Sequence, residues 1–122
     1  MSDYARFIET WADGQHVFNL DNERAREFEE KNNRSLYATM ANMTHGSWRI
    51  EDVREVIRLA LIGGGAPPSA ALMLVSNYVE KRPLAENTTL AVRILEAAFF
   101  GQEKAPGSVE REEVDRALGA AE

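Results

Sequence analysis

Residues 51–69 read EDVREVIRLALIGGGAPPS, an amphipathic run that ends in three glycines and two prolines. Val53, Ile57 and Leu61 recur at helical spacing, while the charged residues lie apart from them. The pattern predicts a helix from about Glu51 to Ile62. The glycines that follow have two interpretations, because such a run can either end a helix or wrap a phosphate group.

The position of the glycine run decides between these interpretations. A phosphate-binding P-loop follows a strand and ends in Gly-Lys-Ser/Thr, whereas this run follows a helix. Two prolines come next, and no lysine occurs until Lys81. We therefore interpret the run as a helix end, with Gly63 or Gly64 in the left-handed conformation and Ser69 as the cap of the next helix. An enzyme built around these glycines has no other support.

The first 20 residues predict a β-hairpin, because Asp13-Gly14 lies between two runs of alternating polarity. A two-residue turn at this dipeptide gives three facing pairs: Trp11–His16, Glu9–Phe18 and Phe7–Leu20. The face that carries these aromatic side chains is the expected core face. Glu9 does not fit there, so it lies at the edge or the register differs by one residue.

Cap residues and apolar periodicity predict four further helices, over residues 22–32, 36–43, 70–80 and 88–100. Their expected N-caps are Asp21, Ser35, Ser69 and Asn87. The third should bury Leu72, Leu74, Val75, Tyr78 and Val79. The last is apolar on most of its circumference, including Phe99, so we place it centrally. The fold class is therefore mainly α: a small helical bundle of about five helices with an N-terminal β-hairpin.

A single helical domain is predicted over residues 1–101, with the hairpin at about residues 5–20. The composition shifts after Gly101, and KAPGS at residues 104–108 predicts a linker. Residues 109–121 place four apolar side chains on one side of a short helix: Val114, Ala117, Leu118 and Ala121. This apolar face is thin, so residues 102–122 are expected to be a mobile tail or a segment that folds against a partner.

Composition excludes several classes of function. The chain has 122 residues, a formal net charge of −6 and no cysteine. An acidic surface repels phosphate, so we expect no nucleic-acid or membrane partner and no DNA-binding regulator. Without cysteine, disulfides, thiolate nucleophiles and zinc-thiolate sites are excluded. Neither a secretory signal pattern nor an apolar run of membrane length occurs, so a cytoplasmic location is expected.

No catalytic, cofactor-binding or metal site is predicted. The two histidines, His16 and His45, form no metal-binding pair with each other or with a nearby carboxylate. Neighbouring carboxylates such as Glu29 and Glu30 fall on different helix faces. No serine lies in a Gly-x-Ser-x-Gly motif. We therefore expect that the protein is not an enzyme.

The strongest candidate for binding is the start of the central helix at Trp48, because tryptophan and arginine dominate binding hot spots. The turn at Arg82-Pro83 is the second candidate segment. Together they give the predicted partner-binding residues: Trp48, Arg49, Arg54, Arg58, Arg82, Pro83, Leu84 and Glu86. The alternative is internal packing, in which Trp48 is buried and Ile50 staples the helix start.

Several segments resemble those of a known family: FNL at 18–20, REFEEKNN at 26–33, GSWRIEDVREVIRLALIGGG at 46–65 and YVEKRPLAENTTLAVRILEAAFFG at 78–101. The sequence resembles the small protein encoded in gene transfer agent and related phage tail gene clusters, from about Thr10 to Gly101. That family carries two labels, phage tail assembly chaperone and tail tube protein.

The resemblance implies a tail assembly chaperone without catalysis, which binds the tape measure protein during tail morphogenesis. Tail tube protein is a further candidate partner, and self-association into a homo-oligomer is a further alternative. The alternative implied function is a structural minor tail or tail tube-associated component of the particle. A tube subunit usually needs a large β-sheet to form stacked rings. Because one hairpin is predicted, the chaperone is the first expectation.

Overall fold

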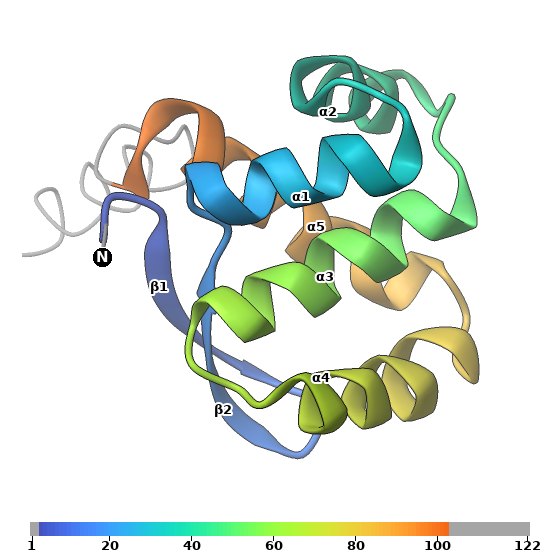
Figure 1. Ribbon diagram of the computed structural model, residues 1–122. Helices are drawn as coiled ribbons and strands as arrows, with labels where there is room; N and C mark the ends of the chain where they lie inside the picture. Colours follow the sequence, from blue (N-terminus) through green and yellow to red (C-terminus); the bar gives the residue numbers. More distant parts are fainter. Residues whose placement is uncertain (1–2, 103–122) are drawn as a thin grey trace, which may run out of the picture.

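The computed structural model describes residues 3–102, which form a two-stranded hairpin followed by five α-helices (Figure 1). The elements are, in order, β1 (Arg6–Trp11), β2 (Gly14–Asn19), α1 (Asn22–Asn32), α2 (Leu36–His45), α3 (Ile50–Gly63), α4 (Pro68–Val75), the π-helical turn η1 (Ser76–Glu80) and α5 (Ala85–Phe100). The predicted fold class, mainly α with an N-terminal β-hairpin, is confirmed.

Helix α3 is the centre of the fold, since it packs against β2, α1, α4 and α5 (Figure 1). Six of its apolar side chains are buried: Val53, Val56, Ile57, Leu59, Ala60 and Leu61. Burying each large aliphatic side chain contributes roughly 1.5–3 kcal/mol before entropy is counted. The sequence places the last helix centrally, but α5 leaves Phe99 49 % exposed at its end. Helix α5 nevertheless packs against α3, α2 and β2, and it buries four of its predicted inward-facing residues: Leu90, Ala91, Ile94 and Leu95.

The hairpin forms, but its turn lies one residue earlier than predicted. The facing pairs are Phe7–Phe18, Glu9–His16 and Trp11–Gly14. The turn residues are therefore Ala12 and Asp13, with φ of Ala12 at 60°. Each pairing moves by two residues along the partner strand, so every side chain keeps its predicted face. Phe7 and Phe18 consequently stack in the core, with ring centroids 5.6 Å apart.

Helix α5 explains why a carboxylate is tolerated on the core face of the hairpin. Glu9 lies at the edge of that face and forms an ion pair with Arg93. The guanidinium of Arg93 also lies 4.1 Å from the centre of the Phe7 ring. The charge of Glu9 is thus matched by a cation that itself packs on the core.

The first two helices begin and end close to where the sequence predicts. Asp21 and Ser35 each accept a hydrogen bond from the backbone amide three residues on, at 3.0 and 2.9 Å. Helix α1 ends at Asn33, whose backbone is left-handed with φ of 52°. Helix α2 continues to His45, two residues beyond the prediction, because Gly46 with φ of 79° ends it.

Helix α4 differs from its prediction in both its cap and its buried face. Pro68 is its first residue, so Ser69 lies within the helix and does not cap it. Proline suits the first turn because it has no amide proton to satisfy. Ala71 and Val75 are buried, four residues apart, whereas Leu72 is 48 % exposed. Leu72 is rotated out of the buried stripe by one helical position.

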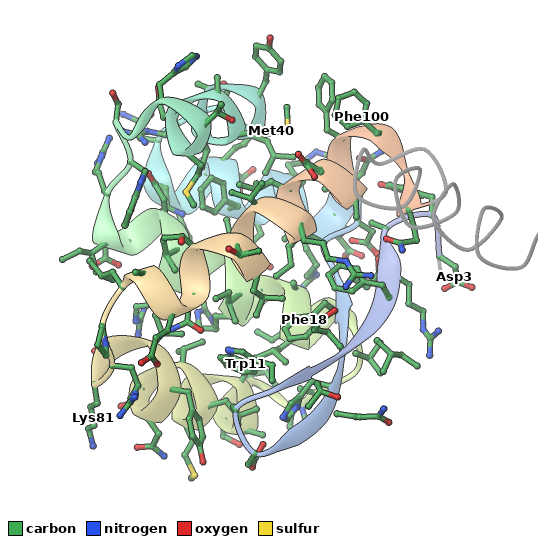
Figure 2. All side chains as sticks on the ribbon, turned by 180° about the vertical axis from the view of Figure 1, so that it is seen from behind. Asp3, Trp11, Phe18, Met40, Lys81 and Phe100 are labelled. Carbon is green, nitrogen blue, oxygen red and sulfur yellow. The ribbon has the colours of Figure 1, made fainter. Side chains whose placement is uncertain are left out.

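Asn87 has a different role from the predicted helix cap, because α5 begins two residues earlier at Ala85. Its buried side-chain oxygen accepts a hydrogen bond from the indole nitrogen of Trp11 at 2.7 Å. Its amide nitrogen donates to the backbone carbonyl of Tyr78 at 2.9 Å. Asn87 therefore ties η1 and α5 to the hairpin through the half-buried Trp11, which Figure 2 labels.

The glycine run ends α3 as predicted, but the individual glycines act differently. Gly65 carries the positive φ, 114°, whereas Gly64 has φ of −82°. A β-carbon added to Gly63 would lie 1.9 Å from the carbonyl oxygen of Asn19, and one added to Gly64 would lie 2.1 Å from that of Val17. Two glycines therefore let β2 approach the end of α3, and only the third is needed for its backbone conformation.

Candidate partner-binding surface

Two neighbouring hollows open where the start of α3 meets η1 and the start of α5. The first, of about 570 Å³, is lined by Ile50, Glu51, Arg54, Val79, Glu80, Arg82 and Leu84. The second, of about 430 Å³, is lined by Met43, Trp48, Leu84, Ala85, Thr88, Thr89 and Val92. Leu84 lines both, so the two hollows adjoin at this residue. We call their combined lining the Leu84 surface.

The structure brings four of the predicted partner-binding residues together on the Leu84 surface: Trp48, Arg54, Arg82 and Leu84. Arg49, Pro83 and Glu86 are exposed beside them in the chain but line neither hollow. Arg58 lies one helical turn further along α3, away from the hollows. The predicted set therefore divides into a surface group, its exposed neighbours and one distant arginine.

Trp48 combines the two roles that the sequence leaves open. It is half-buried and packs against the hydrophobic core, yet it also lines the second hollow. Ile50 is 54 % exposed and lines the first hollow, which does not fit the proposed staple. The second hollow is mostly apolar, and its lining includes the threonines Thr88 and Thr89. This chemistry suits an apolar side chain from a partner.

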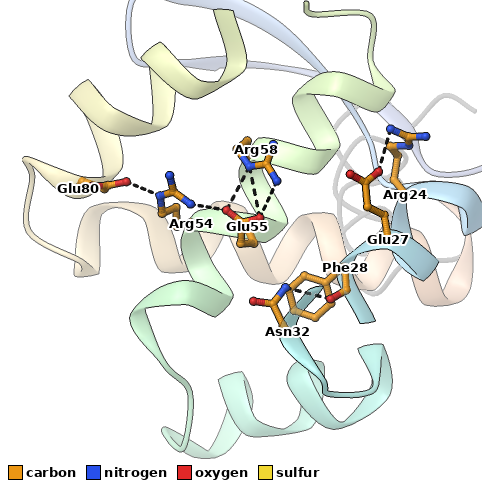
Figure 3. A network of polar contacts seen from close by, with 8 residues as sticks. All are labelled: Arg24, Glu27, Phe28, Asn32, Arg54, Glu55, Arg58 and Glu80. Atoms are coloured by element: carbon orange, nitrogen blue, oxygen red, sulfur yellow. Dashed lines mark hydrogen bonds and ion pairs between the residues drawn. The ribbon is translucent and has the colours of Figure 1, made fainter. Parts of the chain in front are cut away.

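The first hollow has charged walls, and its Arg54, Glu80 and Arg82 form ion pairs within the chain. Arg54 on α3 forms ion pairs with Glu80 of η1 and with its neighbour Glu55, as Figure 3 shows. The side chain of Arg54 is 22 % exposed. Its guanidinium thus joins the central helix to η1, and it contributes a positive edge to the hollow at the same time.

Arg58 belongs to a buried network and is not a surface group. Its guanidinium donates hydrogen bonds to both carboxylate oxygens of Glu55, at 2.7–3.3 Å (Figure 3). Burial opposes ionisation of Glu55, but the bonds and charges of Arg58 and Arg54 outweigh it, so the pKa of Glu55 lies below its usual value. The hydrogen bonds that Arg58 donates to Glu55 raise the pKa of Arg58 in turn. Both groups stay charged at neutral pH.

The turn before α5 carries an exposed ion pair. Arg82 donates to both carboxylate oxygens of Glu86, at 3.0 and 2.8 Å. This contact raises the pKa of Arg82 and lowers that of Glu86. Because both side chains are in solvent, the pair contributes little to stability. The pair lies beside the first hollow, which Arg82 lines.

A comparison with protein families identifies the kind of protein that carries this surface. Residues 8–101 match the model of a family described as phage tail tube protein, GTA-gp10. The chain belongs to this family. No curated protein and no solved structure matches the chain.

Membership of this phage tail tube family confirms the expected relationship to gene transfer agent and phage tail proteins. The family description names a tail tube protein, which is a structural part of a tail. It therefore supports the structural alternative better than the expected role of tail assembly chaperone. It names neither the tape measure protein nor any other partner.

Sequence reasoning missed several residues of this tail protein's surface: Met43, Ile50, Glu51, Val79, Glu80, Ala85, Thr88, Thr89 and Val92. An apolar residue flanked by charges, such as Ile50, is a signal that could have been used. No sequence signal identifies Val79 and Glu80, because the π-helical turn changes which side chains of this segment share a face.

The described residues contain neither a metal-binding cluster nor a helix that could cross a membrane. Across residues 3–102, no group of three or more histidine, aspartate or glutamate side chains could hold a metal ion. Within the same residues, no helix combines the length and the apolar character that crossing a bilayer requires. The candidate site on the described residues is therefore the Leu84 surface, where an apolar hollow lies beside a charged one.

Proposed function

We propose that this protein is a structural, non-catalytic component of a phage-like tail, associated with the tail tube, and that it binds another tail protein through the Leu84 surface. The observation that carries the proposal is the match of residues 8–101 to a family described as phage tail tube protein. The Leu84 surface supplies a physical means of contact, because it pairs an apolar hollow with a charged one.

The small sheet favours a tube-associated position over a place in the tube wall. Within residues 3–102 the sheet has two strands, whereas stacked rings of subunits usually need a large one. The glycines at the end of α3 also lie against the backbone of β2, at Val17 and Asn19. That strand is therefore poorly placed to extend a sheet into a neighbouring subunit. Side-chain contacts through the Leu84 surface are the better route.

The proposed partner contact places an apolar side chain in the hollow between Trp48 and Leu84. A helix with an apolar stripe would present such side chains at successive turns. The neighbouring charged hollow then selects among partners, since a misplaced charge beside Arg54 or Glu80 would be costly once water is excluded. Affinity comes from the apolar hollow and specificity from the charged one.

The variant Thr89→Arg tests this contact. Thr89 is exposed and lines the apolar hollow, so a long charged side chain fills the hollow and leaves the core intact. The control is Ser69→Arg, which makes the same charge change at an exposed position of α4. Tagged chains are used to capture the tail tube and tape measure proteins expressed from the same tail gene cluster, and each captured protein is quantified.

We expect Thr89→Arg to reduce capture of the tail partner at least tenfold, since a loss of about 1.4 kcal/mol changes affinity by that factor. Ser69→Arg should capture as much as the native chain. Thermal unfolding of all three proteins must remain similar for the comparison to count. Equal capture by both variants would rule out the Leu84 surface as the binding site.

A second candidate function is that of a tail assembly chaperone for the tape measure protein, acting in the cytoplasm of the producing cell. The observation that favours it is the fold itself, which is mainly helical and has a two-stranded sheet. An apolar hollow could shield the exposed apolar stripe of a helical client. Co-expression tests this role. The chaperone role predicts that the tape measure protein stays soluble when it is co-expressed with the native chain, but not when it is co-expressed with the Thr89→Arg variant.

A further inference from the structure

The two strands of the hairpin differ in what lies along their outer edges. Each strand pairs with the other on one side only, because the sheet has two strands within residues 3–102. The outer edge of β2 lies beside the end of α3 (Figure 1), where the carbonyl oxygens of Asn19 and Val17 meet Gly63 and Gly64. The outer edge of β1 has no such cover from α3. No residue of β1 lines either hollow of the Leu84 surface.

The positions of the β2 carbonyls show which backbone groups of β1 point outward. Facing residues of an antiparallel pair alternate between those that exchange two hydrogen bonds and those whose backbone groups point away from each other. Val17 and Asn19 are of the second kind, since their carbonyls lie against α3. The residues that face them are Ile8 and Arg6. The backbone groups of Arg6, Ile8 and, two residues on, Thr10 therefore point away from β2. We call these three residues the β1 edge.

The β1 edge offers donors and acceptors for a further strand. Within residues 3–102, the amide of Arg6 bonds to the carbonyl of Asp3 at 3.1 Å, whereas Ile8 and Thr10 make no backbone hydrogen bond outside the hairpin. The side chains of all three edge residues are exposed, that of Ile8 by 52 %. A row of such backbone groups is a template for pairing with another chain. Its occupant is therefore an extended strand.

We propose that the β1 edge pairs antiparallel with the β1 edge of a second copy of this chain, about a two-fold axis at Ile8. The amide of each Ile8 then donates to the Ile8 carbonyl of the other copy, and Thr10 of one copy faces Arg6 of the other. The two hairpins join into one sheet. The two Ile8 side chains cover each other on its exposed face, as cross-strand neighbours do.

Charge and side-chain type favour this register. An axis at Glu9 or at Arg6 would place two like charges directly opposite each other, which is destabilising. The axis at Ile8 sets Glu9 opposite Phe7 and Arg6 opposite Thr10. It also places an apolar, β-branched pair at the middle of the contact, where such residues suit a strand. The sequence of β1 is thus complementary to itself in this one arrangement.

The closed edge of β2 favours a second copy as the occupant and limits the assembly to two. Because α3 lies against β2, the pairing of two β1 edges leaves no open edge at either end of the joined sheet. Such an isologous contact closes on itself, whereas a contact between two different edges would continue into a ring or a fibre. The pair therefore fits a tube-associated component better than a subunit of the tube wall. It leaves the Leu84 surface of each copy available for a tail partner.

Amide hydrogen exchange, followed by NMR on the full-length native chain, tests the contact without a mutation. The contact is small for a protein interface, so exchange is compared at about 20 μM and about 1 mM protein. We expect the amides of Ile8 and Thr10 to exchange about threefold more slowly, or slower still, at the higher concentration. The amide of Gln15 is the internal control, because it points out of the opposite edge and should not change.

Two results of this experiment would overturn the proposal. The first is exchange at Ile8 and Thr10 that is equally fast at both concentrations. The second is slow exchange at both concentrations, which would mean that the β1 edge is covered within a single copy. In either case the proposed binding of a tail protein through the Leu84 surface is untouched, since it is measured by capture of that partner.

A proline substitution separates backbone pairing from side-chain contact. Ile8→Pro removes the outward-pointing amide proton, and proline is tolerated at a strand edge that faces solvent. Gln15→Pro is the matched control, because it makes the same change on β2. Ile8→Thr keeps the amide and the branched shape of the side chain. All variants must retain the circular dichroism of the native chain, and the exchange measurement on the native chain decides the question if Ile8→Pro does not fold.

Sedimentation of the full-length chain and its variants at about 1 mM measures the pairing. The native chain and Gln15→Pro should form dimers, and Ile8→Thr should form them less readily. Ile8→Pro should remain a monomer. Dimerisation of Ile8→Pro equal to that of the native chain would overturn the proposal, and so would a native chain that stays monomeric at this concentration.

Discussion

Gly63→Ala is predicted to destabilise the protein, although replacing glycine by alanine within a helix ordinarily stabilises it by about 0.5–1 kcal/mol. Gly63 is the last residue of α3 and lies against the backbone of β2. The added β-carbon would lie 1.9 Å from the carbonyl oxygen of Asn19, whereas real contacts of this kind are essentially never under 3.0 Å. The strand must therefore move by about 1.1 Å, the difference between these two distances.

That movement is costly because β2 is anchored on both sides of the contact. Phe18 precedes Asn19 and Leu20 follows it, and both are fully buried. Forcing such a shift in a packed core costs typically ~1–3 kcal/mol, and the backbone atom involved puts Gly63→Ala near the upper end. After subtracting the helical gain, a net loss of about 2 kcal/mol is expected. The melting temperature should fall by roughly 8–12 °C.

Thermal and urea unfolding monitored by circular dichroism measure this effect. Gly46→Ala is the control, because a β-carbon there meets no atom within 4 Å and the variant carries only the strain of φ at 79°. That strain costs about 1–2 kcal/mol. A native-like or raised stability of Gly63→Ala would refute the inference that the glycine run serves close packing of helix and strand.

Three further predictions concern buried polar groups and a cap. The low pKa of folded Glu55 means that its stabilising contribution is present above its unfolded pKa, about 4.5, and is lost as the pH falls through its folded pKa. The stability difference between the native chain and Glu55→Gln, measured by urea unfolding, should therefore shrink below about pH 4.5; a pH-independent difference would contradict this. Asn87→Leu leaves the indole of Trp11 and the carbonyl of Tyr78 without their partner, so unfolding should show a loss of about 2–4 kcal/mol, and a loss under 1 kcal/mol would count against this. Ser35→Ala removes a helix cap and should cost about 1 kcal/mol by the same assay, with no loss if the cap is unimportant.

Local signals in the sequence were sufficient for the elements whose ends depend on nearby residues. Asp21, Ser35 and Asn33 form the caps expected of them, because a cap is an interaction over three or four residues. Asn87 looked like another cap, but it bonds to Trp11, which is 76 positions away. No local pattern distinguishes a capping asparagine from one that is buried by distant elements.

The glycine run and α4 illustrate the same limit. The sequence shows that the run ends a helix, but the close approach of β2 to Gly63 and Gly64 follows from tertiary packing. The π-helical turn η1 follows Val75, and it changes which side chains after Val75 lie on the same face as those of α4. Leu72 lies before this turn, in regular α4, and was misassigned because Ala71, and not the larger Leu72, takes the buried position one turn before Val75.

The candidate surface was partly predictable. Residue type pointed to Trp48 and Arg82, and the structure places both on the Leu84 surface. Arg58 has the same residue type as Arg54, yet its guanidinium is taken up by buried Glu55. Residue type shows which groups a side chain is able to bind. The fold decides whether an intramolecular partner, such as Glu55 for Arg58, already binds it.

The most direct test of the central claim is quantitative mass spectrometry of purified particles from a cell that carries the tail gene cluster. A tube-associated structural component should be present in a fixed ratio to the tail tube protein in every preparation. The Thr89→Arg variant should be depleted from particles while it stays folded in the cell. Absence of the native protein from finished particles, despite abundance in the producing cell, would contradict the account and favour the chaperone.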